Sequence, residues 1–364
     1  MTVDALTTTA SSPTPPRADA LLRYPCGPAP ATGAAKEVAP GVRWLRLPLP
    51  AAKAAHINCW ALRDGDGWAV VDTGMFAPVC VDAWNALLAA DGALDGQPLT
   101  RVFATHMHSD HVGMAGWLTR RANCELWMTR TEYLSARLNV ADAEREAPEP
   151  VLAFYRRAGW DEASLAQVRQ GHGRFGKVTS PLPEGHRRLQ DGQRLTVGQH
   201  EWQVVVGNGH SPEHACLYCP ALKLLISGDQ ALPLVSSNVS VLPAEPHADP
   251  LHDWLSSLDK LRHAIADDVL VLPAHDDPFR GLHARLDSLA ARRRRALDRT
   301  RQALAAAPQR AIDIVQALFG RGLGDWFVLK LATGEALAYL NWLLERGEAT
   351  VRDDAAGVAW YAPR

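Results

Sequence analysis

Residues 105–113 read Thr105-His106-Met107-His108-Ser109-Asp110-His111-Val112-Gly113. Three histidines and one aspartate fall within six residues, in the order H-x-H-x-D-H. In a chain of 364 residues with 14 histidines, on the order of 10⁻³ such arrangements are expected by chance. The apolar residues 99–105 predict a short strand that ends at His106, and the turn after it would fold the other three side chains back to one point. This pattern favours a metal site over a histidine-rich surface loop.

Three other apolar stretches, residues 204–206, 224–226 and 269–272, are each followed closely by a His or an Asp. In layered α/β sheets, ligands bind at the carboxyl ends of the strands. Imidazole and carboxylate together favour zinc over magnesium or calcium, and seven donors suit two ions. The candidate ligands are His106, His108, Asp110, His111, His210, Asp229 and His275.

These motifs resemble those of the metallo-β-lactamase superfamily, in particular its dinuclear branch near glyoxalase II. The resemblance covers roughly residues 40–280. It implies an α/β fold of the αββα type, in which two mixed sheets lie between layers of helices. It also implies a ligand assignment: His106, His108 and His210 for one zinc, Asp110, His111 and His275 for the second, and Asp229 as the bridge between them.

Two further motifs carry the resemblance. Asp72, in the V-V-D-T-G of residues 70–74, matches an early aspartate of the family that orients a ligand histidine. Residues 209–212, G-H-S-P, resemble the family's Gly-His-Thr-Pro. The family has a small residue after this proline, whereas this chain has Glu213 and His214.

The resemblance implies a hydrolase that uses a hydroxide bridging two Zn²⁺ ions, with Fe or Mn as alternative metals. Asp110 would bind metal and orient the nucleophile or take its proton. The substrate expected from the glyoxalase II resemblance is a small ester, thioester or lactone. Some relatives oxidise thiols or persulfides with one iron, but the complete second set of ligands favours two metals.

Beyond residue 281 the composition changes to Ala, Arg and Leu at helical spacing, with no strand expected before about residue 350. Thr333 could cap a helix that ends at Gly347, and a two-stranded hairpin would follow. This pattern resembles the winged-helix-like appendage of a subgroup that includes an endoribonuclease. We therefore predict a winged-helix-like C-terminal domain over residues 281–364.

Metal-dependent endoribonuclease or phosphodiesterase activity is the alternative function. Residues 283–301 carry seven arginines against two aspartates, a net charge of +5 that could bind phosphates. Such a run is more often a solvated helix face, and the formal net charge of -2 gives no overall attraction to nucleic acid. We therefore favour a small-molecule substrate over nucleic acid.

The rest of the chain divides by composition. Residues 1–18 contain almost no large apolar residue and predict a disordered tail, and residues 19–280 would form the catalytic domain. A helical stretch at about 131–185 would insert into this domain as a lid over the site. Phe154, Tyr155 and Trp160 are candidate lid contacts, although core packing is the commoner role for aromatic residues. The loop at residues 234–238 is expected to face the metals, with a plain surface loop as an equally common alternative.

The overall composition, 47% hydrophobic and 21% charged, is that of a soluble globular protein. No apolar run is long enough for a membrane span, and no secretory signal is recognisable. The six scattered cysteines, Cys216 and Cys219 among them, are expected to be buried thiols rather than a disulfide framework. We predict a cytoplasmic protein that does not associate with membranes and that could form homo-oligomers.

Overall fold

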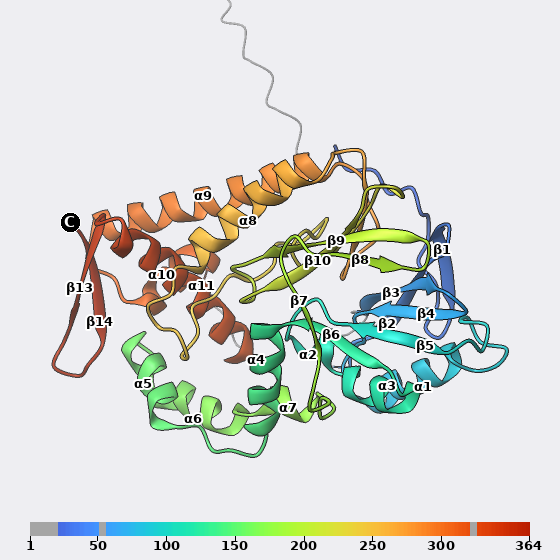
Figure 1. Ribbon diagram of the computed structural model, residues 1–364. Coiled ribbons are helices and arrows are strands. Elements are labelled where there is room, and N and C mark those ends of the chain that lie inside the picture. Colours follow the sequence, from blue (N-terminus) through green and yellow to red (C-terminus); the bar gives the residue numbers. More distant parts are fainter. Residues whose placement is uncertain (1–20, 51–55, 321–325) are drawn as a thin grey trace, which may run out of the picture.

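The computed structural model describes residues 21–50, 56–320 and 326–364. Two β-sheets lie face to face, and helices cover the outer face of each (Figure 1). This arrangement confirms the αββα sandwich that the motifs predict. The tail predicted at residues 1–18 lies outside the described residues.

The first sheet has seven strands in chain order. β1 to β4 pair antiparallel, and β4 to β7 pair parallel. A hairpin joins β3 to β4 through a turn at residues 65–66. The strands are β1 (Ala35–Ala39), β2 (Val42–Pro48), β3 (His56–Asp64), β4 (Gly67–Val71), β5 (Leu99–Phe103), β6 (Glu125–Thr129) and β7 (Arg187–Leu189).

The second sheet has five strands in the order β12-β11-β10-β9-β8. Only β11 and β12 pair parallel, and the other pairs are antiparallel. The apolar stretches at residues 204–206, 224–226 and 269–272 form strands of this sheet, as predicted. The strands are β8 (Arg194–Val197), β9 (His200–Gly207), β10 (His214–Cys219), β11 (Leu224–Gly228) and β12 (Leu270–Pro273).

Three apolar layers hold the sandwich together. Between the sheets lies a core that includes Trp44 and Trp60, which stack with ring centroids 6.1 Å apart, and Trp202. Helices α1 (Pro78–Leu87) and α3 (Ala115–Ala122) cover the outer face of the first sheet. Helices α8 (Pro250–Ala264) and α9 (Leu282–Ala306) cover the outer face of the second sheet. Burial on both faces explains why these strands are almost continuously apolar.

The predicted helical insertion lies between β6 and β7, which pair directly. It contains α4 (Arg130–Ala141), α5 (Glu149–Arg157), α6 (Glu162–Gly171) and α7 (Arg174–Lys177). Tyr155 and Trp160 are buried in a core shared with the C-terminal helices, and Phe154 packs against that core. The alternative role of these three residues, core packing, is therefore confirmed, and their assignment as lid contacts is wrong.

The C-terminal region contains α10 (Ala311–Phe319), α11 (Trp326–Glu345), and a hairpin of β13 (Ala349–Asp353) and β14 (Ala359–Pro363). The two-stranded hairpin and the end of α11 just before Gly347 agree with the prediction from the sequence. The prediction that Thr333 caps this helix is wrong, because Thr333 lies buried inside α11. Its hydroxyl donates to the Leu329 carbonyl at 2.8 Å and accepts from Trp160 Nε1 at 3.0 Å. A hydroxyl satisfied within the helix does not need a capping position.

The arginine run on α9 is split between surface and interior. Arg292, Arg294 and Arg295 are exposed, whereas Arg293 is only 2% exposed. Arg285, two turns earlier, is also buried and donates to backbone carbonyls of residues 232 and 235. Positions eight residues apart share one helix face, which here is the buried face. The net charge of +5 therefore counts cations that the surface does not carry.

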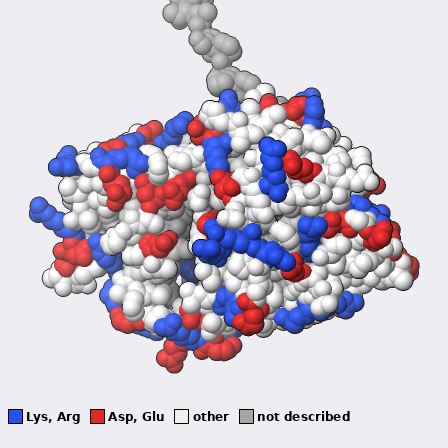
Figure 2. Space-filling view, in the orientation of Figure 1, with Lys and Arg blue, Asp and Glu red and all other residues white. Residues whose placement is uncertain are grey.

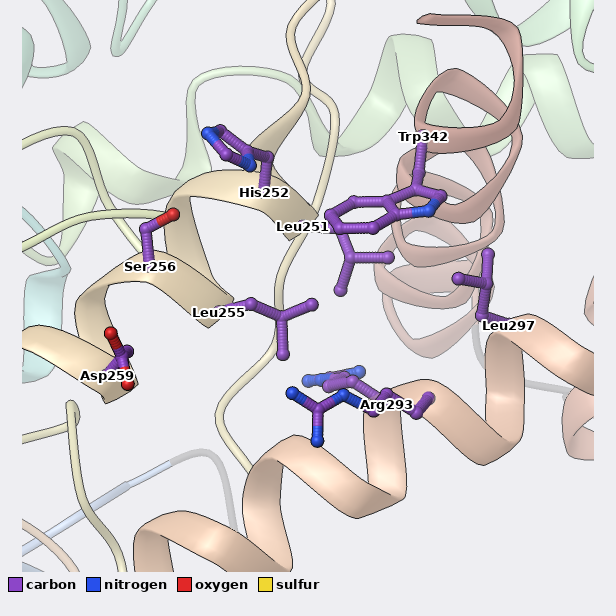
Figure 3. Close-up of a pocket in the computed structure, with 9 residues that line it drawn as sticks. Leu251, His252, Leu255, Ser256, Asp259, Arg293, Leu297 and Trp342 are labelled. Atoms are coloured by element: carbon purple, nitrogen blue, oxygen red, sulfur yellow. The ribbon is translucent and has the colours of Figure 1, made fainter. Parts of the chain in front are cut away.

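Arg293 ties α9 to α11 and to the loop at residues 234–238. Its guanidinium pairs with Glu335, donates to Tyr339 Oη at 3.0 Å, and donates to the carbonyl of Ser237. It lies at the wall of a cavity of about 390 Å³ between α8, α9 and α11, beside Leu297 and Trp342 (Figure 3). Basic and acidic side chains are interspersed on the face of the molecule drawn in Figure 2. Within the described ranges, no helix has the length and apolar character needed to cross a membrane.

Arg293→Ala is expected to destabilise the protein by about 3–5 kcal/mol, because it leaves Glu335 without its partner in a largely buried setting. Urea unfolding of the variant measures the loss. Arg294→Ala, which removes an exposed arginine from the same helix, is the control and should change stability by less than about 0.5 kcal/mol. Equal effects of the two substitutions would contradict the structural role of Arg293.

Candidate metal centre

The H-x-H-x-D-H segment begins just after β5. The chain turns at residues 105–108 and enters a single helical turn, α2 (Ser109–Val112). His106 and His111 are completely buried. Asp110 and His111 lie in this helical turn. The candidate ligands of the segment therefore come from the end of a strand and from the start of a helix, which lie close together.

The other candidate ligands also follow strands. His210 comes after β9, Asp229 after β11 and His275 after β12. The structure brings all seven predicted side chains to one edge of the sandwich, where they form two groups. Within each group, the ligand atoms lie within 4.8 Å of one another. The first group is His106, His108, His210 and Asp229, and the second is Asp110, His111 and His275.

The first group consists of closely packed imidazoles. His106 Nε2 lies 2.8 Å from His108 Nδ1 and 3.3 Å from His210 Nε2. Burial and the neighbouring histidines lower the pKa of His106 well below its usual range, and burial together with His210 lowers the pKa of His108 to about 3. These rings are therefore neutral and offer nitrogen lone pairs, as metal ligands must.

The second group combines histidines with carboxylates. Burial acts to lower the pKa of His275, but Asp229 and Asp110 outweigh it and raise that pKa to about 9. Asp229, Asp72 and Asp110 likewise raise the pKa of His111 against the effect of burial. Burial opposes ionisation of Asp110, yet His111 and His275 hold its pKa below the usual range. The carboxylates are therefore ionised and favour positive charge at this point.

Asp229 connects the two groups. Its Oδ2 lies 3.3 Å from His210 Nε2, whereas its Oδ1 lies 3.6 Å from both His111 Nε2 and His275 Nε2. Burial works against ionisation of Asp229, but His111 and His275 hold its pKa well below the usual range. One ionised oxygen thus faces each group, which is the geometry that a bridging ligand requires.

Two buried atoms test whether a metal fits here. His111 Nε2 and Asp229 Oδ1 have no hydrogen-bond partner among the described residues. A buried polar atom without a partner costs about 1–3 kcal/mol, and a cation between these two atoms would satisfy both. The donor set therefore fits metal ions.

Most of the histidines are anchored through Nδ1, so that Nε2 points into the centre. His111 Nδ1 lies 2.8 Å from Asp72 Oδ2, the contact expected for that early aspartate. His210 Nδ1 donates to the Asn238 carbonyl at 2.7 Å, and His275 Nδ1 donates to the carbonyl of residue 56 at 3.0 Å. Such contacts fix the tautomer and the orientation of a ligand ring.

Glu132 is a buried residue that the sequence analysis missed. It lies on α4 with no exposed surface. Its Oε2 accepts from Met107 N at 2.8 Å, and its Oε1 accepts from Glu213 N at 2.7 Å. It therefore joins the loop that carries His106 and His108 to the loop that follows His210. A signal was available, because Glu132 shares the buried face of α4 with Ala136, four residues later.

Glu213 and His214, where the chain departs from the family motif, both make contacts that support the site. Glu213 Oε2 accepts from Thr131 N at the start of α4 at 2.8 Å. His214 Nε2 accepts from the backbone N–H of Asp229 at 3.0 Å. Burial lowers the pKa of His214 to about 3, which keeps this nitrogen available as an acceptor.

The C-terminal helices reach the site through Asn238. While its carbonyl holds His210, its Nδ2 donates to Glu335 Oε2 at 3.2 Å. Of the loop at residues 234–238, only Asn238 lines the cavity beside the two groups, and Leu234 is 58% exposed. The expectation that this whole loop faces the centre is therefore wrong, because Arg285 and Arg293 hold its earlier part against α9.

The cavity beside the two groups has a volume of about 420 Å³. Among its lining residues are His108, Asp110, His210 and Asp229. The insertion contributes Phe175, whose ring centroid lies 6.5 Å from that of His108, and α11 contributes Phe327 and Leu331. Both the insertion and the C-terminal region thus border the candidate centre.

The fold and this centre define a metal-binding hydrolase of one family. The chain belongs to the metallo-beta-lactamase superfamily, whose family model matches residues 53–275. A second family model, described as the metallo-beta-lactamase-like C-terminal domain, matches residues 297–364. The winged-helix shape and the place near glyoxalase II remain predictions.

Individual relatives agree with this family. The crystal structure of a beta-lactamase domain protein from Burkholderia ambifaria is 39% identical, with a TM-score of 0.87 over 95% of this chain and 99% of that one. The probable metallo-hydrolase YqjP of Bacillus subtilis is 23% identical over 76% of this chain and 84% of its own length. Hydroxyacylglutathione hydrolase of Rhizobium meliloti is 27% identical, over 44% of this chain and 68% of its own length.

Glu132→Ala is expected to weaken Zn²⁺ binding by about 10- to 100-fold, because it removes the group that positions both ligand loops. Two buried N–H groups also lose their acceptor, at about 1–3 kcal/mol each. Competition with a chelator measures the affinity, and urea unfolding measures the stability. The control is Glu184→Ala, since this side chain is 90% exposed. A stability loss with unchanged zinc affinity would refute the positioning role.

Proposed function

We propose that this protein is a zinc-dependent hydrolase that acts on a small ester, thioester or lactone. The observation that carries the proposal is the pair of ligand groups that share Asp229. His106, His108 and His210 would hold one ion, Asp110, His111 and His275 the other, and Asp229 would bind both. This donor set is typical of zinc, with iron or manganese as alternatives.

Metal ions bound here would lower the pKa of a water molecule that they bind and would polarise the substrate carbonyl. The residues of the chain do the rest. Asp110 lines the cavity and is ionised, so it can accept a hydrogen bond from the attacking water and orient it. Its depressed pKa makes it an orienting group rather than a strong base. Phe175 and Leu331 cover part of the cavity and exclude solvent from the reacting carbonyl.

Three observations support a small substrate over RNA. Helix α11 lines the cavity and is therefore part of the site wall. Two of the arginines counted toward a phosphate-binding surface, Arg285 and Arg293, are buried. The third observation is the similarity to hydroxyacylglutathione hydrolase, a relative of which the match covers 68% of the length.

We also propose the division of the chain into a catalytic domain to residue 280, with an insertion at about 131–185, and a C-terminal domain from residue 281. Helix α9 begins at Leu282. A cytoplasmic location is part of the proposal, because all six cysteines are free thiols and suit a reducing compartment.

Purified protein is expected to bind two Zn²⁺ per chain, and Asp229→Ala should bind fewer than about one, because this carboxylate faces both groups. Asp110→Ala should retain about one ion, since it leaves the first group complete. Metal analysis after dialysis measures the content, and hydrolysis of a thioester panel measures activity. Asp259→Ala, which changes an exposed aspartate on α8, is the control. Full metal content in Asp229→Ala would refute the shared-ligand assignment.

Changing Arg292, Arg294 and Arg295 together to glutamine should leave turnover of the best thioester within about threefold, because exposed charges away from a site contribute little. Arg293 is left unchanged because it is buried. If RNA were the substrate, its binding would weaken and the salt dependence would fall by roughly one unit of slope for each lost phosphate contact. The endoribonuclease alternative would be favoured if the protein cleaved RNA in a metal-dependent way and if this triple change and His108→Ala each abolished the cleavage.

A further inference from the structure

The cavity at the candidate centre has an apolar wall beyond the ligand groups. Its members come from loops of the catalytic domain, from the insertion and from α11: Met75, Met107, Phe175, Leu242, Phe327 and Leu331. Leu242 is 42% and Phe327 51% exposed at this wall. Large apolar side chains gathered around a cavity and left open to water are typical of a site that binds an apolar group.

The charges that line the cavity are of one sign. Among the described residues of the lining, none is a lysine or an arginine. The ionisable residues outside the two ligand groups are Glu245 and Asp253, both carboxylates. Burial, and after it the nearby Asp249 and Glu245, raise the pKa of Asp253, so these acidic groups already repel one another. An anion at the end of the cavity beside Glu245 and Asp253, away from the ligand groups, would lose its hydration and meet no lysine or arginine in the described lining.

We propose that the substrate carries an extended apolar acyl group with no anionic substituent, and that this group lies between Phe175 of the insertion and Phe327 and Leu331 of α11. This inference rests on the proposed function and narrows its substrate class. It disfavours thioesters of glutathione, because glutathione carries two carboxylates. An uncharged or a cationic end can approach Glu245 and Asp253, whereas a carboxylate is repelled there.

The first test compares matched substrates on the zinc-loaded full chain. The panel is the butanoyl, octanoyl and 7-carboxyheptanoyl thioesters of one neutral thiol, N-acetylcysteamine, with S-lactoylglutathione as the anionic comparison. kcat/KM for the octanoyl thioester is expected to exceed that for the butanoyl thioester by at least about tenfold, because four more methylenes leave water. The terminal carboxylate should reverse most of this gain. Preference for the butanoyl, carboxylated or glutathione thioester would overturn the inference while leaving the proposed function standing.

The second test changes the wall. Phe327→Ala is expected to raise KM for the octanoyl thioester at least about threefold and to leave KM for the butanoyl thioester unchanged, because only the longer chain reaches α11. Val328→Ala is the matched control, since Val328 is the next residue, is 45% exposed and does not line the cavity. An equal effect of both variants, or an equal effect on both substrates, would contradict the placement of the acyl group.

The third test concerns the acidic pair. The double variant Glu245→Gln, Asp253→Asn should narrow the ratio of octanoyl to 7-carboxyheptanoyl kcat/KM by at least about threefold, because it removes the repelling charges. Glu144→Gln with Asp259→Asn, which neutralises two exposed carboxylates outside this cavity, should leave the ratio unchanged. A ratio that is unchanged in the first double variant would refute the role of the pair.

A binding measurement separates this inference from the proposed function. If no thioester is hydrolysed, the proposed function fails. Calorimetry then still tests the cavity with two amides that are not cleaved: octanoic acid N-methylamide and the mono-N-methylamide of suberic acid, which carries a terminal carboxylate. Tighter binding of the uncharged amide supports the inference. Equal or weaker binding of the uncharged amide overturns it.

Discussion

The carboxylate of Asp229 is the group on which both halves of the candidate centre depend. One oxygen faces His210 and the other faces His111 and His275, so a shift of this side chain would disturb both ligand groups together. Its position is set by the end of β11 and by the bond from its backbone N–H to His214. A neutral, buried histidine at the start of β10 thus holds the backbone from which the shared ligand projects.

The ligand loops are held in turn by segments that are distant in sequence. Glu132 of the insertion joins two of these loops, and Asn238 connects His210 to Glu335 on α11. Arg293 completes this chain of contacts, since it pairs with Glu335 and binds the carbonyl of Ser237. Glu132 and Arg293 are buried, Asn238 and Glu335 are partly buried, and each has its partner in place, an arrangement that is rigid when satisfied and costly when broken. The insertion and the C-terminal helices are therefore structural parts of the centre.

Local sequence patterns predicted that the seven side chains converge, and the family resemblance that they carry implied the sandwich. A buried strand is a short apolar run, and a His or Asp soon after it lies at the sheet edge, so the ligand positions could be inferred together with the H-x-H-x-D-H segment. Glu132 and Arg293 could not be inferred in this way, because their partners are backbone groups and side chains dozens of residues away. Thr333 misled for the same reason, since its hydroxyl is satisfied within α11 and by Trp160 rather than at a helix start.

Local patterns and distant contacts also account for different properties of the site: the type of reaction and the choice of substrate. Metal ions held by histidines and carboxylates would polarise any carbonyl placed beside them, so the strongly patterned segments define the type of reaction and little more. Selection among substrates must come from the surfaces that surround the centre, and here these surfaces belong to the insertion and to α11, whose side chains at the cavity are apolar. Phe175 and Leu331 show no periodic signal that marks them as wall residues, because their role depends on how separate helices meet above the ligands. The segments least readable in the sequence are therefore the ones that shape access to the candidate centre.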